Sequence, residues 1–594
     1  MARNSVRQDE DIQKHSKIEI TKRLLKYLGP YKLKVFFVLF LLIFVMLVGI
    51  LNPYLLKIAI DKYISNNDLR GLLLIGLAML ILNYLAFLAS RKRIKTMASV
   101  TNNIMVNIRH ELYSHIQKLS FSFFDNRPVG KILARVIGDV NALQELFNNS
   151  ITNFIPELLG LICVAIVMFS MNYKLSLLAM AILPFLAVSM FLIETISRKR
   201  WQQFRMKRSN MNAYTHEQFS GIKIVQGYAT EEDSSKTFAV LVKEMMDSFI
   251  HAVKLNDLFW PLVEISWGIG TVIVYWYSVK LIGMGVTVGT VIAFSSYIGM
   301  FWRPILNISS FYNTLITNFA AADRIFDIMD IQPDIKDIEE AAKMPKIKGK
   351  VEFKNVSFCY EDNVTVLDNV SFQIPAGETV ALVGATGAGK TTIVNLISRF
   401  YDATSGEVLI DGINVKDVEL ESLRSQMGIM LQDTFLFSTT IMENIRYGRL
   451  DATDEEVIAA AKAVNAHDFI MKLPKGYNTD VNERGSRLSV GQRQLISFAR
   501  ALLANPRILI LDEATSNIDT ATERLVQKGI QKLLMGRTSF VIAHRLSTIR
   551  DCNRIMVVND GRIIESGTHE QLMKLKGSYY NLYMSQYKFL NEGA

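Results

Sequence analysis

The chain has 594 residues, of which half are hydrophobic and 21% are charged, and its formal net charge is +10. Soluble domains carry about 25% charged residues, so this composition, with a positive mean hydropathy of +0.21, argues against a purely soluble protein and predicts at least two domains, one of them in a membrane. The three cysteines, Cys163, Cys359 and Cys552, form no CxxC motif and no Cys/His cluster, which argues against a disulfide framework and a zinc site.

The N-terminal residues 1–17 are polar and mixed in charge, and Asp9, Glu10 and Asp11 interrupt their basic character. They contain no apolar core and no cleavage site, so we expect neither a secretory signal nor a transit peptide. Residues 18–28 (IEITKRLLKYL) mix basic and aliphatic side chains in an amphipathic pattern. This pattern predicts a helix that lies in the membrane interface before the first span.

Six apolar stretches in the first half of the chain are each long enough to cross a bilayer, which takes about 20 residues. They are residues 34–56, 72–90, 154–172, 175–193, 259–282 and 286–308. The third and fourth are separated only by a short turn around Tyr173 and Lys174. Because charged residues mostly do not interrupt these stretches, the sequence predicts an all-α membrane domain with six transmembrane helices rather than a large soluble core.

Basic residues gather before the first span and directly after the second, at Arg91, Lys92, Arg93 and Lys95. By the positive-inside rule, this bias predicts a multi-pass protein of the cell membrane with both termini in the cytoplasm. A basic inner face beside anionic lipid also accounts for the net positive charge, so we expect no nucleic-acid partner.

Two long segments, 91–150 and 198–258, lie between spans on the predicted cytoplasmic side. Both keep apolar residues at helical spacing and contain few Pro or Gly, so we expect long cytoplasmic helical extensions. Each has a local break, at residues 122–132 (SFFDNRPVGKI) and 214–232. We expect these breaks to form the tips of helical hairpins that dock on a cytoplasmic domain.

The polar and charged stretch 327–350 is typical of a linker. It divides the chain into a membrane domain at residues 1–326 and a second domain at residues 351–594. After Val351, short β-rich runs alternate with helical patterns, as in VEFKNVSFCY, TVALVG and ILILDE. This alternation predicts an α/β domain with a parallel sheet.

The run GATGAGKTT fits the pattern G-x-x-x-x-G-K-[ST] and lies between a predicted buried strand and a predicted helix. Such a loop holds the phosphates of ATP with backbone N–H groups, and its glycines allow the tight turn. Lys390 is expected to reach the β- and γ-phosphates, and the Thr391 hydroxyl to hold Mg²⁺. The predicted nucleotide-binding residues here are Gly384, Ala385, Thr386, Gly387, Ala388, Gly389, Lys390, Thr391 and Thr392.

Asp512 and Glu513 end a second apolar strand, ILILDE. Acidic residues in that position are costly unless they serve a cation or catalysis. We expect Asp512 to hold Mg²⁺ and Glu513 to polarise the attacking water. His544 follows a third apolar strand (SFVIAHRLS), where we expect a contact with the γ-phosphate, although a lone histidine is more often structural.

The order of these motifs, with Gln432 and LSVGQ (488–492) between them, resembles that of an ATP-binding cassette (ABC) transporter of the exporter type over nearly the whole chain. The resemblance implies a P-loop ATPase domain in which Tyr360 stacks on adenine, while Gln432 contacts Mg²⁺ and couples the site to the membrane domain. It also implies that the signature LSVGQ acts in trans. Ser489, Gly491 and Gln492 of one subunit would then close over ATP bound to its partner.

The resemblance further implies that the breaks near residues 122–130 and 221–227 are coupling helices. Two stretches depart from the family pattern: Val490 stands where the usual signature LSGGQ has glycine, and SNID (516–519) stands where SALD is usual. A side chain at Val490 adds bulk where backbone must approach phosphate closely. The chain therefore resembles the glutamate-bearing subunit of a heterodimeric exporter, and the alternative is a tolerated variation in a homodimer.

We expect a half-transporter that exports hydrophobic or amphipathic, multidrug-type compounds by alternating access, driven by hydrolysis of Mg²⁺-bound ATP. Glu264 lies in the fifth span, where ionisable residues are costly. It either receives a cationic apolar compound beside Trp260 and Trp267 or pairs near the inner interface. The remaining alternatives are a homodimeric exporter of lipid or peptide, and a nucleotide-gated channel or channel regulator on the same scaffold.

Overall fold

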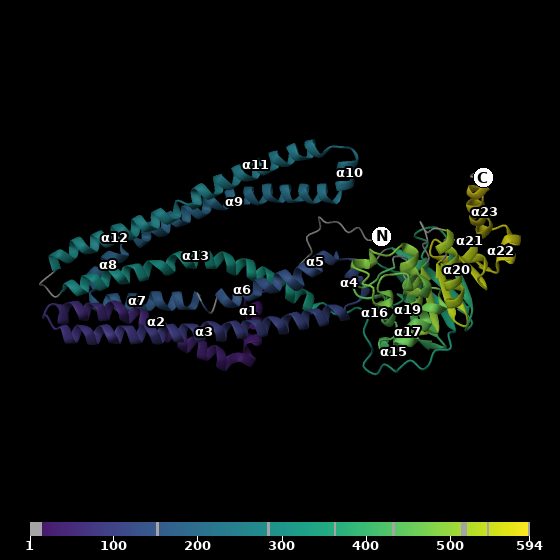
Figure 1. The fold of residues 1–594 in the computed structure, drawn as a ribbon, viewed down its shortest axis with the longest axis horizontal. Helices are drawn as coiled ribbons and strands as arrows, with labels where there is room; N and C mark the ends of the chain where they lie inside the picture. Colours follow the sequence, from purple (N-terminus) through teal and green to yellow (C-terminus); the bar gives the residue numbers. More distant parts are fainter. Residues whose placement is uncertain are drawn as a thin grey trace. The chain divides into compact units, whose positions relative to one another are not determined.

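The computed structural model describes residues 15–149, 152, 154–281, 286–360, 364–430, 434–512, 520–542 and 546–591. Within these residues the chain forms two compact units, which we describe separately (Figure 1). The helical unit contains residues 15–117 and 129–331. The α/β unit contains residues 118–128, from the first predicted hairpin tip, together with residues from 332 onward.

The helical unit is built from long helices joined by short turns. Its elements are α1 (Lys17–Leu28), η1 (Gly29–Tyr31), α2 (Lys32–Ile58), η2 (Ala59–Ile64), α3 (Leu69–Lys118), α5 (Val129–Ala134), η3 (Arg135–Asp139), α6 (Val140–Asn149), α7 (Ile155–Met171), α8 (Tyr173–Met180), α9 (Leu183–Ser220), α10 (Ile222–Gly227), α11 (Glu231–Asn256), α12 (Phe259–Leu281) and α13 (Val288–Asp330).

Four helical stretches among the described residues are long and apolar enough to cross a membrane: Lys17–Ile64, Leu69–Lys118, Tyr173–Ser220 and Glu231–Leu281. Two shorter apolar helices, Ile155–Met171 and Val288–Phe301, coincide with the third and sixth predicted spans. Each predicted span therefore falls on an apolar helix. Many large apolar side chains of these helices are exposed, as expected of surfaces that face lipid tails rather than water.

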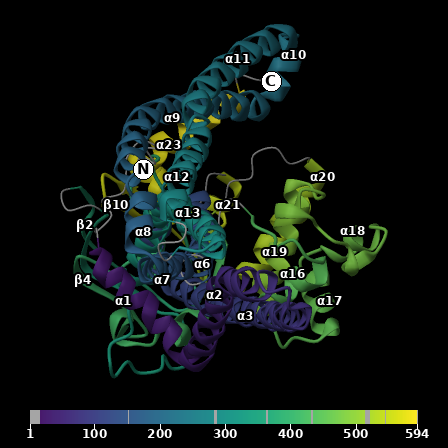
Figure 2. The ribbon, with the colours of Figure 1, turned by 90° about the vertical axis from the view of Figure 1, so that its left-hand side faces the viewer.

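The predicted cytoplasmic extensions are continuous helices rather than separate pieces. α3 runs for 50 residues from the second span to the first hairpin tip, and α9, with 38 residues, begins within the fourth span and continues beyond it to Ser220. α9 and α11 lie side by side and are joined at their tip by the short helix α10 (Figures 1 and 2). A short helix also lies at the first tip, α4 (Phe121–Asp125), which belongs to the α/β unit.

The α/β unit contains two sheets and the helices around them. Its strands are β1 (Val351–Cys359), β2 (Thr365–Ile374), β3 (Thr379–Val383), β4 (Ser405–Ile410), β5 (Ile413–Asn414), β6 (Met427–Met430), β7 (Ile508–Asp512), β8 (Thr538–Ile542), β9 (Arg554–Asn559) and β10 (Arg562–Gly567). Its remaining helices are α14 (Lys390–Ile397), η5 (Val415–Asp417), α15 (Leu420–Arg424), α16 (Ile441–Arg446), α17 (Asp454–Ala463), α18 (His467–Met471), η6 (Gly476–Asn478), η7 (Glu483–Gly485), α19 (Val490–Ala504), α20 (Thr520–Leu534), α21 (Leu546–Arg550), α22 (His569–Leu575) and α23 (Ser578–Asn591).

The larger sheet has the strand order β10-β9-β3-β8-β7-β6, and β9, β3, β8, β7 and β6 are mutually parallel. The smaller sheet, β2-β1-β4-β5, is antiparallel. The carboxyl ends of the parallel strands meet at one edge, where ligands of open α/β sheets bind. The predicted parallel α/β sheet is present, with an antiparallel sheet beside it.

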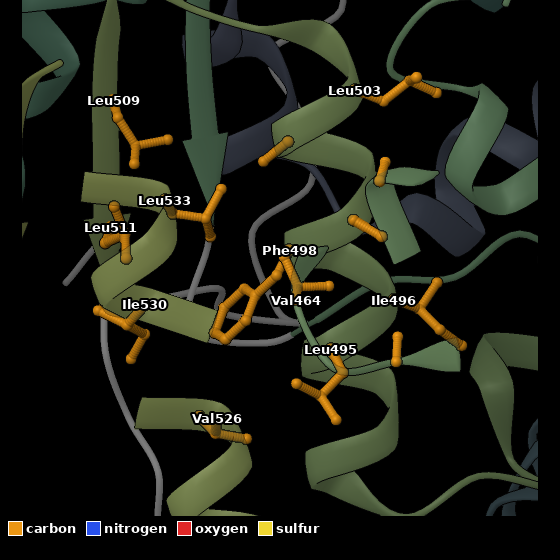
Figure 3. Close-up of a cluster of buried hydrophobic side chains, with 14 of the residues drawn as sticks. Val464, Leu495, Ile496, Phe498, Leu503, Leu509, Leu511, Val526, Ile530 and Leu533 are labelled. Atoms are coloured by element: carbon orange, nitrogen blue, oxygen red, sulfur yellow. The ribbon is translucent and has the colours of Figure 1, made fainter. Parts of the chain in front are cut away.

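Both faces of the parallel sheet are buried, each in a different hydrophobic core. Along β7, Leu509 and Leu511 pack in one core, and Ile508 and Ile510 pack in the other. Because successive strand residues point to opposite faces, a continuous apolar run such as ILIL is needed to fill both cores. In the first core, Phe498 of α19 lies against side chains of α20 and of the sheet (Figure 3).

The predicted linker is ordered along most of its length. α13 continues to Asp330, and the chain beyond it packs on the α/β unit. The buried guanidinium of Arg399 donates to the carbonyl oxygens of Lys336 and Val418, at 3.1 and 2.8 Å. The carboxylate of Asp411 accepts the backbone N–H groups of residues 348–350. The domain boundaries at 326 and 351 stay predictions.

Candidate functional site

The predicted phosphate loop connects the buried strand β3 to the N-terminus of α14, as the sequence indicated. Gly384, Gly387 and Gly389 all have positive φ angles, of 149°, 85° and 105°. A side chain is strained in these conformations, so the glycines are what allow the chain to turn tightly here. The loop thereby brings the unpaired N–H groups of the first turn of α14 to its concave side, an arrangement that favours anions.

Gly384 also lies too close to β9 for any other residue. A Cβ atom at this position would lie 2.1 Å from the carbonyl oxygen of Val558. At Gly387, by contrast, a Cβ atom would meet nothing within 4 Å. The loop is therefore fixed to the sheet on one side and open on the other, where a ligand can approach its backbone.

The side chain of Lys390 lies inside the loop. Its Nζ donates to the carbonyl oxygens of Gly384 and Ala385, at 2.9 and 2.8 Å, and the residue is only 7% exposed. Burial lowers the pKa of Lys390, and the negative charge of Asp512 partly opposes this shift. An ammonium group held by two neutral carbonyl groups is poorly compensated, and polyphosphate oxygens would compensate it better.

The two threonines that follow differ in environment. Thr391 is exposed in the first turn of α14, where its hydroxyl can reach a cation beside the phosphates. Thr392 is buried, and its Oγ1 lies 3.2 Å from the Tyr360 hydroxyl. Thr391 is therefore placed to contact a ligand directly. Thr392 instead contacts Tyr360, the tyrosine that the resemblance assigns to adenine.

Tyr360 belongs to an aromatic cluster. Its ring packs edge-on against Phe358 and Tyr401, with ring centroids 4.7 and 5.0 Å away, and the residue is 45% exposed. One face of a rigidly held tyrosine ring is a suitable surface for stacking a planar base.

The predicted catalytic residues follow neighbouring parallel strands. β7, next to β8 in the sheet, ends at Asp512, whose charge acts on Lys390. Gln432, Glu513 and His544 follow β6, β7 and β8 in the sequence, and all three lie outside the described residues. Their roles stay predictions. The strands before them end at the same edge of the sheet as β3, which is the edge that carries the phosphate loop.

The predicted signature lies at the N-terminus of α19. Ser489 is the N-cap, and its hydroxyl accepts from the backbone N–H of Gln492, whose side chain in turn accepts from the backbone N–H of Ser489. Val490 is the first helical residue and is half-buried, and Gly491 is buried. Val490 has ordinary helical backbone, so it causes no backbone strain. Its effect on a ligand can only come from the volume of its side chain.

These residues fit Mg²⁺-bound ATP. Backbone N–H groups of residues 384–391 and the ammonium of Lys390 can hold the phosphates, and Tyr360 can hold the base. Thr391 and Asp512 offer the oxygen ligands that Mg²⁺ prefers. Among the described residues no group of three or more His, Cys, Asp or Glu side chains could hold a metal by itself. This is expected where the nucleotide phosphates supply part of the coordination.

One part of the site was not anticipated from the sequence. Phe400 and Tyr401, which follow α14, contact the helix α4 at the first hairpin tip. The rings of Phe121 and Phe400 lie 4.7 Å apart, and the Tyr401 hydroxyl donates to Asp125 at 2.5 Å. The aromatic pair in SRFYD (398–402) was the available signal, because two adjacent aromatic residues directly after a helix need partners.

Comparisons with known proteins agree with this architecture. Residues 35–305 match the family model described as the ABC transporter transmembrane region, and residues 367–516 match the model described as ABC transporter. YknV of Bacillus subtilis (strain 168), an ABC transporter ATP-binding protein, is 45% identical over 589 residues, which are 98% of this chain and 96% of that protein. An ATP-dependent lipid A-core flippase of Syntrophus aciditrophicus is 38% identical over 578 residues, covering 97% and 96% of the two chains.

The solved structure of a bacterial Atm1-family ABC exporter with ATP bound is also similar. It has a TM-score of 0.77 and 27% identity, over 93% of this chain and 98% of that one. These likenesses confirm the predicted fold class, a membrane domain of long apolar helices followed by an ATP-binding α/β domain.

Proposed function

Because the chain belongs to the ABC transporter family and is an exporter that couples ATP hydrolysis to transport, we propose that it is one half of a pump for hydrophobic or amphipathic compounds. The main support for this proposal is that one chain contains both the apolar helices and a phosphate loop between β3 and α14, with Lys390 held inside the loop. The proposed orientation has both termini and the α/β unit in the cytoplasm.

The substrate class rests on the surface of α12. Trp260 and Trp267 are 60% and 42% exposed, and Glu264 is exposed between them. At about 100° per residue, these three side chains lie within one narrow strip of the helix. A carboxylate flanked by indole rings suits an apolar compound that carries a positive charge. One relative is named as an ATP-dependent lipid A-core flippase, and lipid A-core is also amphipathic.

The signature favours action between two subunits. Ser489 is exposed at the N-terminus of α19. The Ser489 hydroxyl caps the N–H of Gln492, while the N–H groups of Val490 and Gly491 can reach phosphate bound to a second subunit. The side chain of Val490 stands at the same end of the helix, where it would narrow that approach. We therefore favour a heterodimer in which this chain supplies the phosphate loop and Glu513 of the active site, and a partner supplies an unobstructed signature. In this assembly Mg²⁺ would be held by Thr391, Asp512 and Gln432.

The test uses the purified full chain, alone, in lipid nanodiscs. We expect slow ATP turnover, because both signatures of the resulting homodimer would carry valine. Val490→Gly should raise the turnover rate by about tenfold, the effect of a contact worth about 1.4 kcal/mol in the transition state. Rapid turnover by the unaltered chain, with no gain in Val490→Gly, would show a homodimer instead.

The Glu513→Gln variant tests the enzymatic part separately. It should bind ATP and lose nearly all turnover, in the Val490→Gly background as well. If Glu513→Gln retains most of the activity, the catalytic role proposed for Glu513 is wrong, whichever assembly is present. Loss of ATP binding in the same variant would likewise contradict a purely catalytic role.

A further inference from the structure

A histidine at the start of the described chain joins the interfacial helix to the end of the last membrane helix. His15 precedes α1, and its ring nitrogens face two carboxylates of α13. Nδ1 lies 2.9 Å from Asp323 Oδ1, and Nε2 lies 3.0 Å from Asp330 Oδ2. The backbone N–H of His15 also donates to Asp323, at 3.2 Å. Only 10% of the imidazole is exposed.

With both aspartates ionised, this geometry favours a charged imidazole. A neutral imidazole has one N–H group, whereas an ionised carboxylate can only accept hydrogen bonds. Neutral His15 could therefore donate to either Asp323 or Asp330, but not to both. Its unprotonated nitrogen would then face a carboxylate oxygen, and the lone pairs of these two atoms would repel each other. Both contacts are favourable only in the imidazolium, which donates from each nitrogen.

Other charged groups surround these contacts without replacing them. From α1, Arg23 donates to both oxygens of Asp330, at 2.9 and 2.7 Å, and to Glu19 at 3.1 Å. Its guanidinium also lies 5.3 Å from the ring centroid of Phe326. Asp330 therefore keeps a partner on α1 when His15 is neutral.

Further charged and titratable groups at this end of α13 interact with residues other than His15. On α13, Arg324 forms a two-point ion pair with Asp139 of η3, and Asp327 acts on Arg135. On α3, the His115 imidazole lies 3.0 Å from the carbonyl oxygen of Ile331. The carboxylates that face His15 directly are those of Asp323 and Asp330.

We propose that His15 is a proton-dependent latch that fastens α1 to the cytoplasmic end of α13. In the protonated state the N-terminal end of α1 is tied to Asp323 and Asp330 at once. Loss of the proton breaks one of these ties. α13 leads directly into the segment that is packed on the α/β unit. The latch therefore controls how tightly α1 is attached to the end of α13.

The pH range follows from the environment of the imidazole. Burial lowers the pKa of His15, but the hydrogen bonds and charges of Asp323 and Asp330 outweigh burial, and the pKa is raised above its ordinary value. A raised pKa means that the latch is fully closed below the ordinary value of about 6.5. It opens as the pH rises through the higher value of the folded protein. The latch therefore opens above the pH at which an ordinary histidine loses its proton.

The opened latch loosens α1 without releasing it. Ile20 and Leu24 stay buried, Ser16 still caps the helix, and Arg23 still holds Asp330. The expected change is local fraying of the N-terminal end of α1 rather than unfolding. Amide hydrogen exchange measures such local opening directly.

The experiment compares amide exchange of residues 15–28 at about pH 6 and about pH 8.5, corrected for intrinsic rates, in the full-length protein in nanodiscs. In the unaltered chain, protection of α1 should be about tenfold higher at the lower pH, since one hydrogen bond to a charged group contributes roughly this factor. His15→Gln should show the lower protection at both pH values. His216→Gln, at an exposed site on α9, should behave as the unaltered chain does.

Two further variants separate titration from a general loss of structure. His15→Lys carries a permanent charge, so protection of α1 should no longer fall at the higher pH. Asp323→Asn removes one carboxylate, which should move the transition to lower pH. Equal protection of the unaltered chain at both pH values, or the same pH dependence in His15→Gln, would overturn the latch.

Discussion

The Tyr401 hydroxyl donates a hydrogen bond to the carboxylate of Asp125 at 2.5 Å, across 276 positions of sequence. Tyr401 also packs edge-on against Tyr360, the residue proposed to hold adenine. Burial raises the pKa of Tyr401, as do the hydrogen bond and charge of Asp125, so its hydroxyl stays a donor over the whole physiological range. The helix α4 is thus attached next to the nucleotide site rather than at a distant surface.

Tyr401→Phe should loosen α4 and leave the aromatic cluster in place. The variant keeps the ring against Tyr360 and removes one hydrogen bond to a carboxylate, a contribution of about 1.5–3 kcal/mol. Amide exchange of residues 118–128 should accelerate by about tenfold or more. Tyr447→Phe, at a 56% exposed site, is the matched control and should change nothing in that peptide. Unchanged exchange in Tyr401→Phe would show that the hydrogen bond from Tyr401 to Asp125 does not hold α4, and that its other contacts are sufficient.

The nucleotide-binding half of the site was readable from the sequence because its signals are local. The buried strand β3, the glycines of the loop and the start of α14 follow each other within a few residues, and each obeys a short-range rule. The strand ILILD was equally clear, since a run that is apolar on both faces must be buried on both. The sequence predicted that the first hairpin tip docks, but the residues that attach α4 could not be read in this way. Asp125 and Tyr401 are an ordinary surface acid and an ordinary aromatic residue until the fold brings them together.

The linker shows a second limit of sequence reasoning. Its polarity predicted a linker, and α13 continues through the first four residues of that segment, but polarity does not distinguish a free linker from one held by backbone hydrogen bonds. The groups that hold it, Arg399 and Asp411, lie more than 60 residues away and bind main-chain atoms. Main-chain atoms are the same at every residue, so the sequence of the linker does not reveal these hydrogen bonds, although the side chain of Asp337 also lies 3.9 Å from Arg399.

Asp411→Ala should release the end of the linker. One carboxylate accepts the N–H groups of Lys348 at 2.6 Å and Lys350 at 2.9 Å, together with that of Gly349 at 3.2 Å. Losing this shared acceptor should cost about 2 kcal/mol, a typical value for hydrogen bonds to a charged group. The measurements are amide exchange of residues 336–350 and thermal unfolding of the full chain.

Asp451→Ala is the control for this change, because the Asp451 side chain is 87% exposed. It should leave both measurements unaltered. If residues 336–350 exchange at the same rate in Asp411→Ala and Asp451→Ala, the linker does not depend on Asp411, and other contacts such as those of Arg399 and Gln426 hold it.

Two glycines of α13 make a matched pair for testing the packing of the helical unit. Asp61 accepts the N–H of Gly289 at 2.8 Å, and a Cβ atom at Gly289 would lie 2.6 Å from Asp61 Oδ1 and 2.7 Å from the carbonyl oxygen of Lys57. Gly289→Ala should therefore destabilise the protein by about 1–3 kcal/mol, the usual effect of overpacking. At Gly299 no described atom of the chain lies within 4 Å of such a Cβ, so Gly299→Ala should be neutral or slightly stabilising. Equal melting temperatures of the two variants, followed by tryptophan fluorescence, would show that α13 does not need the close approach to Asp61.

Lys390 offers the most direct test of the ATP site. Its ammonium is buried between two carbonyl groups of the phosphate loop, and burial lowers its pKa because the charged form is poorly solvated there. Bound phosphate would offset this desolvation with charge-assisted hydrogen bonds. Lys390→Ala should reduce ATP turnover by at least about a hundredfold, the effect of removing one preorganised group that stabilises transferring phosphate. Binding of a fluorescent ATP analogue should weaken in the same variant, whereas Lys574→Ala, at an exposed site on α22, should match the unaltered chain in both assays. Turnover within about threefold of normal in Lys390→Ala would mean that another cation neutralises the phosphates, and the proposed role of Lys390 in the loop would be wrong.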